Sequence, residues 1–513
     1  MKSKIALLLV TMMVLSAVLM IGCDKADSGE ERVLNVGFME YITDYNPYTS
    51  SGSDCAGTIQ IYDTLLRPNA QGVYEGHLAD TWSVSDDGMA YTFTLRKGVK
   101  FTNGEELKSV DIAYSVDQAI NSLQTGSSWA FVDSCEIVDD YTVIIHLNTP
   151  GMQFTDLVSS PFASIVNKKA CEEWGDEYGK KLEAIVGTGA YKVSEWVYGE
   201  SSTYVANEDH FKGAPPIKSF KLIKIAEQNS AVIALETGEI DAYISDVPAI
   251  SLDAIEANNK LVLKVYPGAT LFYSIINNES GIFADKRMRQ ALAYSIDRNK
   301  MMVVGSEGRG LITDSPCADH FIGHPGQMTG TWNYETDIDK AQALLAEAGY
   351  AGEKITIKTY ATDAYPKLAT SMQEDMAKAG FTVEVLQMER NAFISDVLGK
   401  GDYQVGICRF VADVYDMFTM SQHLHSENVG TPGNWSRYVN PDMDSMLERA
   451  GASVDLAERK SLYSDIIKLY ADEVPEIPFY YTIDTRAHTT VVKLADVFAK
   501  TEPDRISNYS WAE

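Results

Sequence analysis

One segment has the residue types and spacing of a metal site: Cys317, His320 and His324. They form the pattern C-x-x-H-x-x-x-H, and thiolate and imidazole groups are ligands that zinc accepts. Gly323 and Pro325 stand inside or next to this segment and oppose a helix that would align the three side chains. Three ligands within one loop are little support for a bound metal. We therefore interpret the segment as a plain loop.

A second histidine group has the alternation of residues on one face of a strand: His423, His425 and Glu427. A solvated loop is the simpler interpretation. Short signatures of catalysis are missing from the sequence, which contains no G-x-S-x-G, H-E-x-x-H or G-x-x-x-x-G-K-[ST]. The segment Gly187–Gly189 lacks the third glycine of a dinucleotide-binding loop and is interpreted as a turn. We therefore expect no catalytic residue, no metal and no cofactor.

Cys23 is placed for a different chemistry, the attachment of lipid. The chain begins with two lysines and a 17-residue apolar run, Ile5–Ile21, and the small Gly22 precedes Cys23. A charged start, a short apolar region and a small residue before the cut are typical of a secretory signal. With the cysteine directly after the cut, the segment resembles a bacterial lipobox, although Met20 stands where leucine is usual. We expect residues 1–22 to be removed and Cys23 to carry diacylglycerol; an ordinary signal peptide and an uncleaved anchor are the alternatives.

The remaining chain is long and strongly acidic. Removal of 22 of the 513 residues leaves 491, enough for two or three domains. The formal net charge of −29 becomes −31 once the two lysines of the leader are lost. Such a surface repels nucleic acid, so we expect no nucleic-acid partner. Five cysteines remain, an odd number without paired spacing, which indicates no disulfide framework but leaves one or two bridges open.

Hydrophobic periodicity predicts helices and strands mixed along the whole chain. Strands are expected at 33–38, 91–95, 141–147, 355–360, 381–386 and 477–481. Helices are expected from 109 onward and at 231–239, 286–297, 340–348, 367–379, 442–450 and 456–470. Ser109, Asp285 and Asp339 are the predicted caps, and Gly349 is the predicted end of its helix. The strand–helix–strand segment 355–386 is α/β in character.

The most strongly patterned segment, Leu78–Gly104, reads LADTWSVSDDGMAYTFTLRKGVKFTNG. It is very similar to the signature of the family 5 extracellular solute-binding proteins, the peptide and nickel receptors of ATP-binding-cassette (ABC) importers. Further similar segments follow in the order of that family: 187–196, 234–241, 287–298, 340–350, 411–413 and 474–481. The resemblance covers essentially the whole mature chain. The lipobox agrees with it, because single-membrane bacteria tether these receptors by lipid.

The resemblance implies an α/β fold of two lobes joined by crossing strands, the periplasmic-binding-protein (Venus flytrap, class II/cluster C) fold, with an extra small domain. A lipid-attached tether is expected at 23–32. Lobe I is expected at 33–60, 187–268 and 484–513, the inserted small domain at 61–186, and lobe II at 269–483. In this family the ligand is trapped in the cleft when the lobes close, and the receptor then docks on a permease.

The function implied by the resemblance is that of an extracytoplasmic lipoprotein that captures peptides, either oligopeptides or dipeptides, for an ABC importer. Its expected partners are the permease and ATPase subunits, and its lipid anchor would hold it, as a monomer, on the outer or periplasmic side of the cell membrane. A receptor for nickel, a metal chelate, haem or sugar is the alternative within the family. A secreted hydrolase and a peptide-binding surface protein that imports nothing are alternatives from other classes.

The expected ligand residues are carried over from the same resemblance. A buried peptide terminus needs a fixed counter-charge, and the peptide-binding branch uses an aspartate in an Ala-Asp step for the α-ammonium group. Asp413 matches that step, with a helix cap or turn as its other interpretation and Asp416 as the nearby alternative. Phe410 stands where tryptophan is frequent, and Arg409 has the geometry to bind the ligand carboxylate or a structural partner.

Three more residues complete the expected binding site. Trp435 stands at a position where the chain of family members runs near the ligand, although simple packing also accounts for a tryptophan there. Glu40 and Tyr41 follow the first strand, and in members of the family the ligand backbone lies beside the protein chain at this place. The segment 361–366 contains no arginine, whereas dipeptide receptors carry one there. This difference argues against strict dipeptide specificity.

Overall fold

The computed structural model describes residues 32–126, 128–151, 153–326, 334–362, 364–412, 415–430, 433–453, 455–498 and 502–512. The expected leader with Cys23 lies outside these ranges, and so does Asp413. Residues Leu34–Glu513 form one compact unit and Met1–Val33 another. Within the ranges above, no helix is long and apolar enough to cross a membrane.

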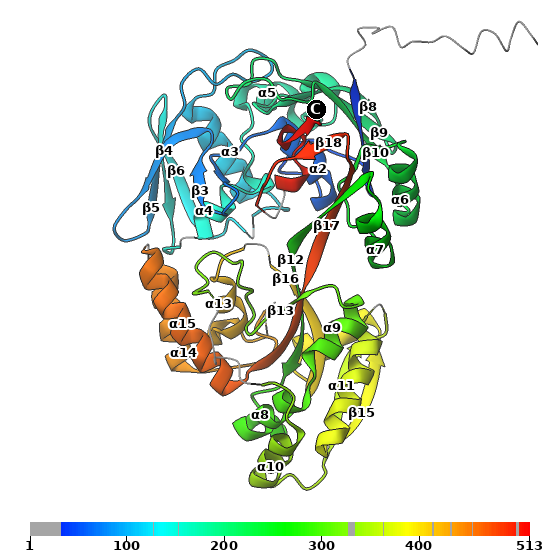
Figure 1. Cartoon of the computed structure of the whole chain (residues 1–513). Coiled ribbons are helices and arrows are strands. Elements are labelled where there is room, and N and C mark those ends of the chain that lie inside the picture. The colour runs from blue at the N-terminus through cyan, green and yellow to red at the C-terminus, as the bar shows by residue number, and fades with distance from the viewer. Residues whose placement is uncertain are drawn as a thin grey trace, which may run out of the picture. The chain divides into compact units, whose positions relative to one another are not determined.

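The backbone of the larger unit is an 11-stranded sheet with the order β15-β14-β16-β12-β17-β11-β1-β10-β9-β8, to which β13 adds by pairing with β17. The strands are β1 (Val33–Phe38), β8 (Tyr191–Val197), β9 (Ser201–Ala206), β10 (Ser219–Lys224), β11 (Ala242–Tyr243), β12 (Leu261–Ile276), β13 (Leu311–Ile312), β14 (Lys354–Tyr360), β15 (Thr382–Met388), β16 (Val405–Val411) and β17 (Glu476–Thr489). The two long strands β12 and β17 are antiparallel and run side by side (Figure 1). They connect the elements of a first lobe to those of a second.

The first lobe contains β1, β8–β11 and a separate four-stranded antiparallel sheet with the order β4-β5-β7-β6. The strands of that sheet are β4 (Ala79–Val84), β5 (Ala90–Leu95), β6 (Val132–Asp139) and β7 (Thr142–Leu147); β2 (Leu66–Pro68) pairs with β3 (Tyr74–Gly76), and β18 (Val492–Leu494) with β19 (Tyr509–Trp511). Its helices are α2 (Cys55–Ile61), α3 (Ser109–Asn121), α4 (Gln153–Leu157), α5 (Lys168–Trp174), α6 (Gln228–Thr237) and α7 (Ala249–Ala257). One continuous hydrophobic core joins β1, the four-stranded sheet and β18–β19.

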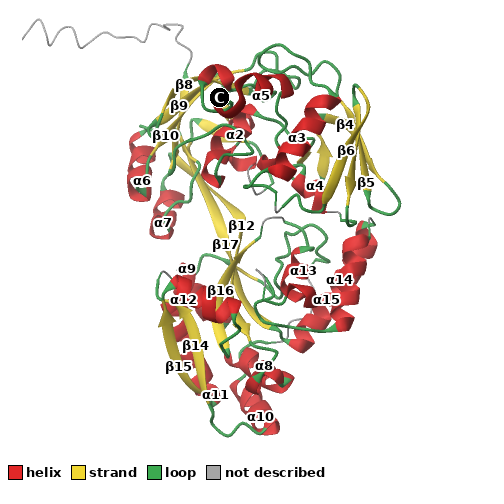
Figure 2. Ribbon diagram, turned by 180° about the vertical axis from the view of Figure 1, so that it is seen from behind, coloured by secondary structure: helices red, strands yellow, loops and turns green. Residues whose placement is uncertain are grey.

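The second lobe is built on the parallel strands β14, β15 and β16, with α11 packed against them (Figure 2). The helices of this lobe are α8 (Lys286–Ser295), α9 (Arg298–Ser306), α10 (Ile338–Ala348), α11 (Tyr365–Ala379), α12 (Arg390–Phe393), α13 (Thr419–Leu424), α14 (Pro441–Ala452) and α15 (Leu456–Glu473). Its buried residues form a second core, which runs from Leu271 to Tyr481. The α/β expectation is confirmed, and the strand–helix–strand segment appears as β14-α11-β15.

Local sequence signals place most element ends within a few residues. Asp285 caps α8 as expected, since its side chain accepts a hydrogen bond from the backbone N–H of Arg287. The expected start of α10 is wrong by two residues: Asp337 is its cap, because its carboxylate reaches the N–H of Lys340. Ser109 is likewise the first helical residue of α3 and not its cap. Gly349 ends α10 in the left-handed conformation, with φ of 76°.

Candidate functional site

A cavity of about 540 Å³ opens beside the strands that connect the two lobes. The first lobe lines it with residues after β1, with the start of α2, and with the loop that follows β11. β12 and β17 add Ala269, Asp484 and Arg486, and the second lobe adds Tyr415. Both apolar and charged groups therefore face this space. Its volume suits a small organic ligand, because ligand pockets of proteins commonly measure 300–1,000 Å³.

Carboxylates dominate the charged lining of the cavity. Arg486 donates from Nη2 to Asp504 Oδ2 at 3.1 Å and from Nη1 to Asp246 Oδ1 at 3.3 Å. Glu502, also in the lining, pairs with Arg505 at 2.7 Å. The carboxylate of Asp484 accepts no hydrogen bond and forms no ion pair in the described part of the chain. Burial, and then the neighbouring Asp246, raise the pKa of Asp484 to about 6.

Of the two expected residues after β1, Glu40 lines this cavity and Tyr41 does not. The Tyr41 ring stands edge-on to Tyr198, with ring centroids 5.5 Å apart. The Lys224 ammonium lies 4.5 Å from the centroid of the Tyr41 ring. Glu40 and Tyr41 also border a narrow pocket between β1 and β8–β10. The end of β1 therefore does border the cavity, but with its acidic residue and not with its aromatic one.

Arg409 and Phe410 point to opposite faces of β16, because successive side chains alternate along a strand. Phe410 is buried, and its ring lies 4.4 Å from that of His423 within the core of the second lobe. Arg409 is exposed and lines a second cavity, of about 440 Å³, together with Phe272 and Asp484. The structure does not bring these two expected ligand residues onto one surface.

Trp435 is half-buried and packs against the core of the second lobe. Its backbone carbonyl accepts a hydrogen bond from the Tyr403 hydroxyl, and its N–H donates to the Gly433 carbonyl at 2.8 Å. It lines neither of the two cavities. Packing accounts for all of these contacts.

The segment that carries the expected anchor is held beside the cavity on both sides of Asp413, which itself lies outside the described residues. Ala412 donates from its N–H to the carbonyl of Ala269, a cavity-lining residue, at 2.9 Å. Tyr415 lines the cavity. Asp416, the alternative anchor, is buried and binds Arg459 of α15 at 2.6 Å. That ion pair engages the carboxylate, so Asp416 holds the segment in place and does not offer its charge to a ligand.

The two histidine groups that resemble metal sites serve other contacts. His423 lies on α13, fully buried, and pairs with Glu476 at 2.9 Å. His425 accepts a hydrogen bond on Nδ1 from the Glu427 N–H at 3.3 Å, and it does so at the end of a helix, not on a strand. His320 lies among the rings of Phe321, Tyr415 and Tyr481. His324 Nδ1 accepts from the N–H of Gly326 at 3.1 Å.

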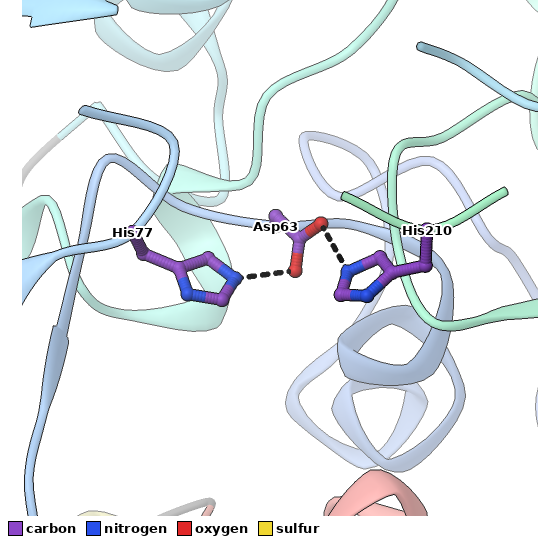
Figure 3. A group of neighbouring side chains, drawn as sticks. All are labelled: Asp63, His77 and His210. Atoms are coloured by element: carbon purple, nitrogen blue, oxygen red, sulfur yellow. Dashed lines mark hydrogen bonds and ion pairs between the residues drawn. The ribbon is translucent and has the colours of Figure 1, made fainter. Parts of the chain in front are cut away.

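Figure 3 shows another group with metal-ligand residue types, Asp63 between His77 and His210. Its members are too far apart in the sequence for any motif to reveal them. His77 Nε2 lies 2.8 Å from Asp63 Oδ1, and His210 Nε2 lies 3.5 Å from Oδ2. Arg67 donates to Oδ1 at 2.6 Å, and the Thr188 hydroxyl donates to Oδ2 at 3.0 Å. Both carboxylate oxygens are therefore engaged.

The guanidinium of Arg67 already occupies the position that a cation would take at Asp63. Burial alone would raise the pKa of Asp63, but the neighbouring His77 and Arg67 outweigh it and hold that pKa well below its usual range. Burial, together with the charge of Arg67, lowers the pKa of His77 to about 3, so this imidazole is neutral at pH 7. We interpret the group as a buried ion-pair network that joins the segment after α2, the strand β2, the segment after β3 and the loops before β8 and β10.

The comparisons with known proteins agree with this fold. The model of the family described as "Bacterial extracellular solute-binding proteins, family 5 Middle" matches residues 73–431. The chain is 26% identical over 503 residues to the oligopeptide-binding protein OppA of Bacillus subtilis (strain 168), with 90% of each chain covered. It is 27% identical over 437 residues to the probable D,D-dipeptide-binding periplasmic protein DdpA of Escherichia coli (strain K12), with 83% of each covered. The structure of HbpA2 from Haemophilus parasuis matches with a TM-score of 0.86 at 23% identity, covering 94% of this chain and 100% of that one.

Two lobes connected by long strands, with a cavity lined by elements of both, define the two-lobed periplasmic-binding-protein fold. The chain belongs to the family 5 bacterial extracellular solute-binding proteins. The relatives compared are named as binding proteins and not as enzymes.

Proposed function

We propose that this chain is the substrate-binding lipoprotein of an ABC importer and that it captures peptides in the 540 Å³ cavity. The observation that carries the proposal is the lining of that cavity by both lobes, at the strands that connect them. Closure of the lobes would enclose a ligand there and remove it from water. The names of OppA and DdpA support peptides as the cargo. The contact of His423 with Glu476 and the contacts of His425 give no support to a nickel receptor.

The division of the chain that we propose follows the family: lobe I at 33–60, 187–268 and 484–513, the small domain at 61–186, and lobe II at 269–483. Two observations support it. The core of the second lobe begins at Leu271 and ends at Tyr481. The core of the first lobe is shared between residues of the proposed small domain, such as Tyr91, and residues of lobe I, such as Leu34. The small domain would therefore move with lobe I when the lobes close.

Asp413→Ala is expected to weaken peptide binding by ten- to a hundred-fold. A charge-assisted hydrogen bond to the peptide ammonium contributes about 1.5–3 kcal/mol, and each 1.4 kcal/mol is about tenfold in affinity. Calorimetric titration with pools of peptides two to eight residues long measures the change. Asp86→Ala, in an exposed turn of the first lobe, is the matched control and should bind normally. Equal affinities of the Asp413 variant and the wild type would remove Asp413 from the site. If no pool bound to either protein, the proposal of peptide capture would be overturned.

Cys23→Ser is expected to release the protein from the membrane without changing its affinity for peptide. Two or three acyl chains anchor a protein stably, whereas one alone does so only marginally, and the substitution removes the thiol that would carry the diacylglycerol. Fractionation of cells into membrane and soluble parts measures the distribution. Cys135→Ser keeps the lipidated residue and should stay with the membrane. Retention of the Cys23 variant in the membrane fraction would contradict the proposed anchor.

A further inference from the structure

Asp484 is a half-buried cavity residue whose carboxylate has no ion-pair partner among the described residues. Its neighbours on the same wall are already satisfied: Asp504 and Asp246 share the guanidinium of Arg486, and Glu502 pairs with Arg505. Arg409 lines the second cavity together with Asp484, but these two described side chains are not within ion-pair distance of each other. An isolated, half-buried carboxylate is unfavourable, because it loses hydration and gains no partner in return.

The backbone around Asp484 is shaped to leave room for this carboxylate. The ladder between β12 and β17 shifts register between Pro267 and Leu271, so Gly268 and its two successors bulge away from regular pairing. A Cβ atom at Gly268 would lie 2.7 Å from the backbone carbonyl oxygen of Thr482, which no side-chain rotation can move, and 2.8 Å from Asp484 Oδ1. Only glycine therefore fits beside the carboxylate. Bulges of this kind redirect side chains and are frequent next to binding sites.

The electrostatic surroundings of Asp484 favour a positively charged group in the cavity. Burial and the nearby Asp246 raise the pKa of Asp484 to about 6, because both disfavour its ionised form. Asp504 acts in the same direction and Arg486 against it. A ligand cation beside Asp484 would restore the lost interaction. A neutral group would leave the cost in place, and an anionic group would increase it.

We propose that Asp484 is a specificity-determining residue that binds a cationic nitrogen of the ligand, an alkylammonium or a guanidinium group. This inference rests on the proposed function and refines it: the cavity selects peptides that present a positive charge at this wall. The charge comes from a basic side chain or from the peptide amino terminus, and the two sources are separable by experiment.

The test compares calorimetric titrations with pools of tri- to pentapeptides that contain one arginine and with otherwise identical pools that contain citrulline, its neutral analogue. Wild-type protein is expected to bind the arginine pool about tenfold more tightly. In Asp484→Asn the two affinities should become equal, with the citrulline affinity unchanged. Asp496→Asn, which removes the same charge from a fully exposed position, should keep the wild-type preference. The second arm compares peptide pools that have a free amino terminus with the same pools after N-acetylation. If wild-type protein prefers the free terminus and Asp484→Asn does not, the amino terminus is the cation that Asp484 binds.

Lower pH gives an independent readout. The preference for arginine should shrink as the pH falls from 7 through 6 to 5, because Asp484 takes up a proton there, and Asp484→Asn should show no such change. A preference for the cation that persists in Asp484→Asn, or is missing from wild-type protein in both arms, overturns the inference. If none of the peptide pools binds, the proposed function is overturned instead. The inference about Asp484 is then tested by the shifts in melting temperature that free arginine and free citrulline cause. A difference between the two shifts that is lost in Asp484→Asn supports the inference, and equal shifts in wild-type protein overturn it.

Discussion

Asp63→Asn is expected to lower the free energy of unfolding by about 3 kcal/mol, within the range of about 3–5 kcal/mol for breaking a buried ion pair from one side. The side chain of Asp63 is 1% exposed and that of Arg67 is 18% exposed. The amide would keep some hydrogen bonds but would leave the Arg67 charge without a counter-charge. Chemical denaturation at pH 7 measures the loss. Adding Arg67→Met to the variant should recover part of it, because the unpaired charge is then gone.

Asp80→Asn is the matched control for this prediction. Asp80 also pairs with an arginine, Arg96, at 2.8 Å, but the two side chains are 58% and 34% exposed. Such exposed pairs contribute about 0–1 kcal/mol, so little change is expected. If the Asp63 and Asp80 variants lost the same stability, the network in Figure 3 would have no special structural role.

The same network makes stability depend on pH. Folding lowers the pKa of His77 from its ordinary value near 6.5 to about 3, so unfolded chains bind a proton there that the folded protein does not. The stabilisation is therefore complete above about pH 6.5 and is lost as the pH falls toward 3. The lowered pKa of Asp63 acts in the same direction below about pH 4. Unfolding curves recorded from pH 7 to 4 should show this decline.

Gly189→Ala is expected to destabilise the protein by about 3 kcal/mol, at the upper end of ordinary overpacking. A Cβ atom at this position would lie 2.4 Å from the carbonyl carbon of Ile61 and 2.7 Å from the carbonyl oxygen of Gln60. Both are backbone atoms at the end of α2, so no side-chain rotation relieves the contact. The Gly189 N–H also donates to the Ile61 carbonyl at 2.7 Å. Thermal and chemical unfolding measure the effect.

Gly52→Ala is the control for the glycine prediction, because nothing lies within 4 Å of a Cβ atom there. It should be neutral or stabilising by up to about 1 kcal/mol, as expected when alanine reduces the freedom of the unfolded chain. A Gly189 variant as stable as the Gly52 variant would show that the loop before β8 can move away from α2. The segment Gly187–Gly189, which the sequence predicts as a turn, also brings two backbones into close contact.

The elements that local patterns define were predictable. The alternation of Tyr91, Phe93 and Leu95 predicts β5, whose alternate residues are indeed buried. The start of α10 was misplaced because two aspartates, Asp337 and Asp339, stand near it, and only the observed bond to the Lys340 N–H identifies the cap. A cap is a contact between a side chain and one particular backbone group, and residue type alone does not choose between neighbours.

The candidate site was predictable only in part. Glu40 lines the cavity, and the ligand-binding roles of Glu40 and Asp413 stay predictions. Asp484, Arg486 and Asp504 had no signal in the sequence, because nothing local marks them as neighbours of one another or of the end of β1. Their relation arises where β17 passes from one lobe to the other, and a bulge opposite them makes the space.

The sequence by itself determined the family, the α/β character and most helix and strand positions, because these depend on periodicity, caps and motifs within short stretches. Tertiary structure alone decided which charges meet. It engaged Asp416 with Arg459, enclosed Asp63 with Arg67 and left Asp484 facing the cavity. Residues of one type and similar local surroundings thus received different roles, because the energy of a carboxylate depends on the groups that the fold brings within a few ångströms of it.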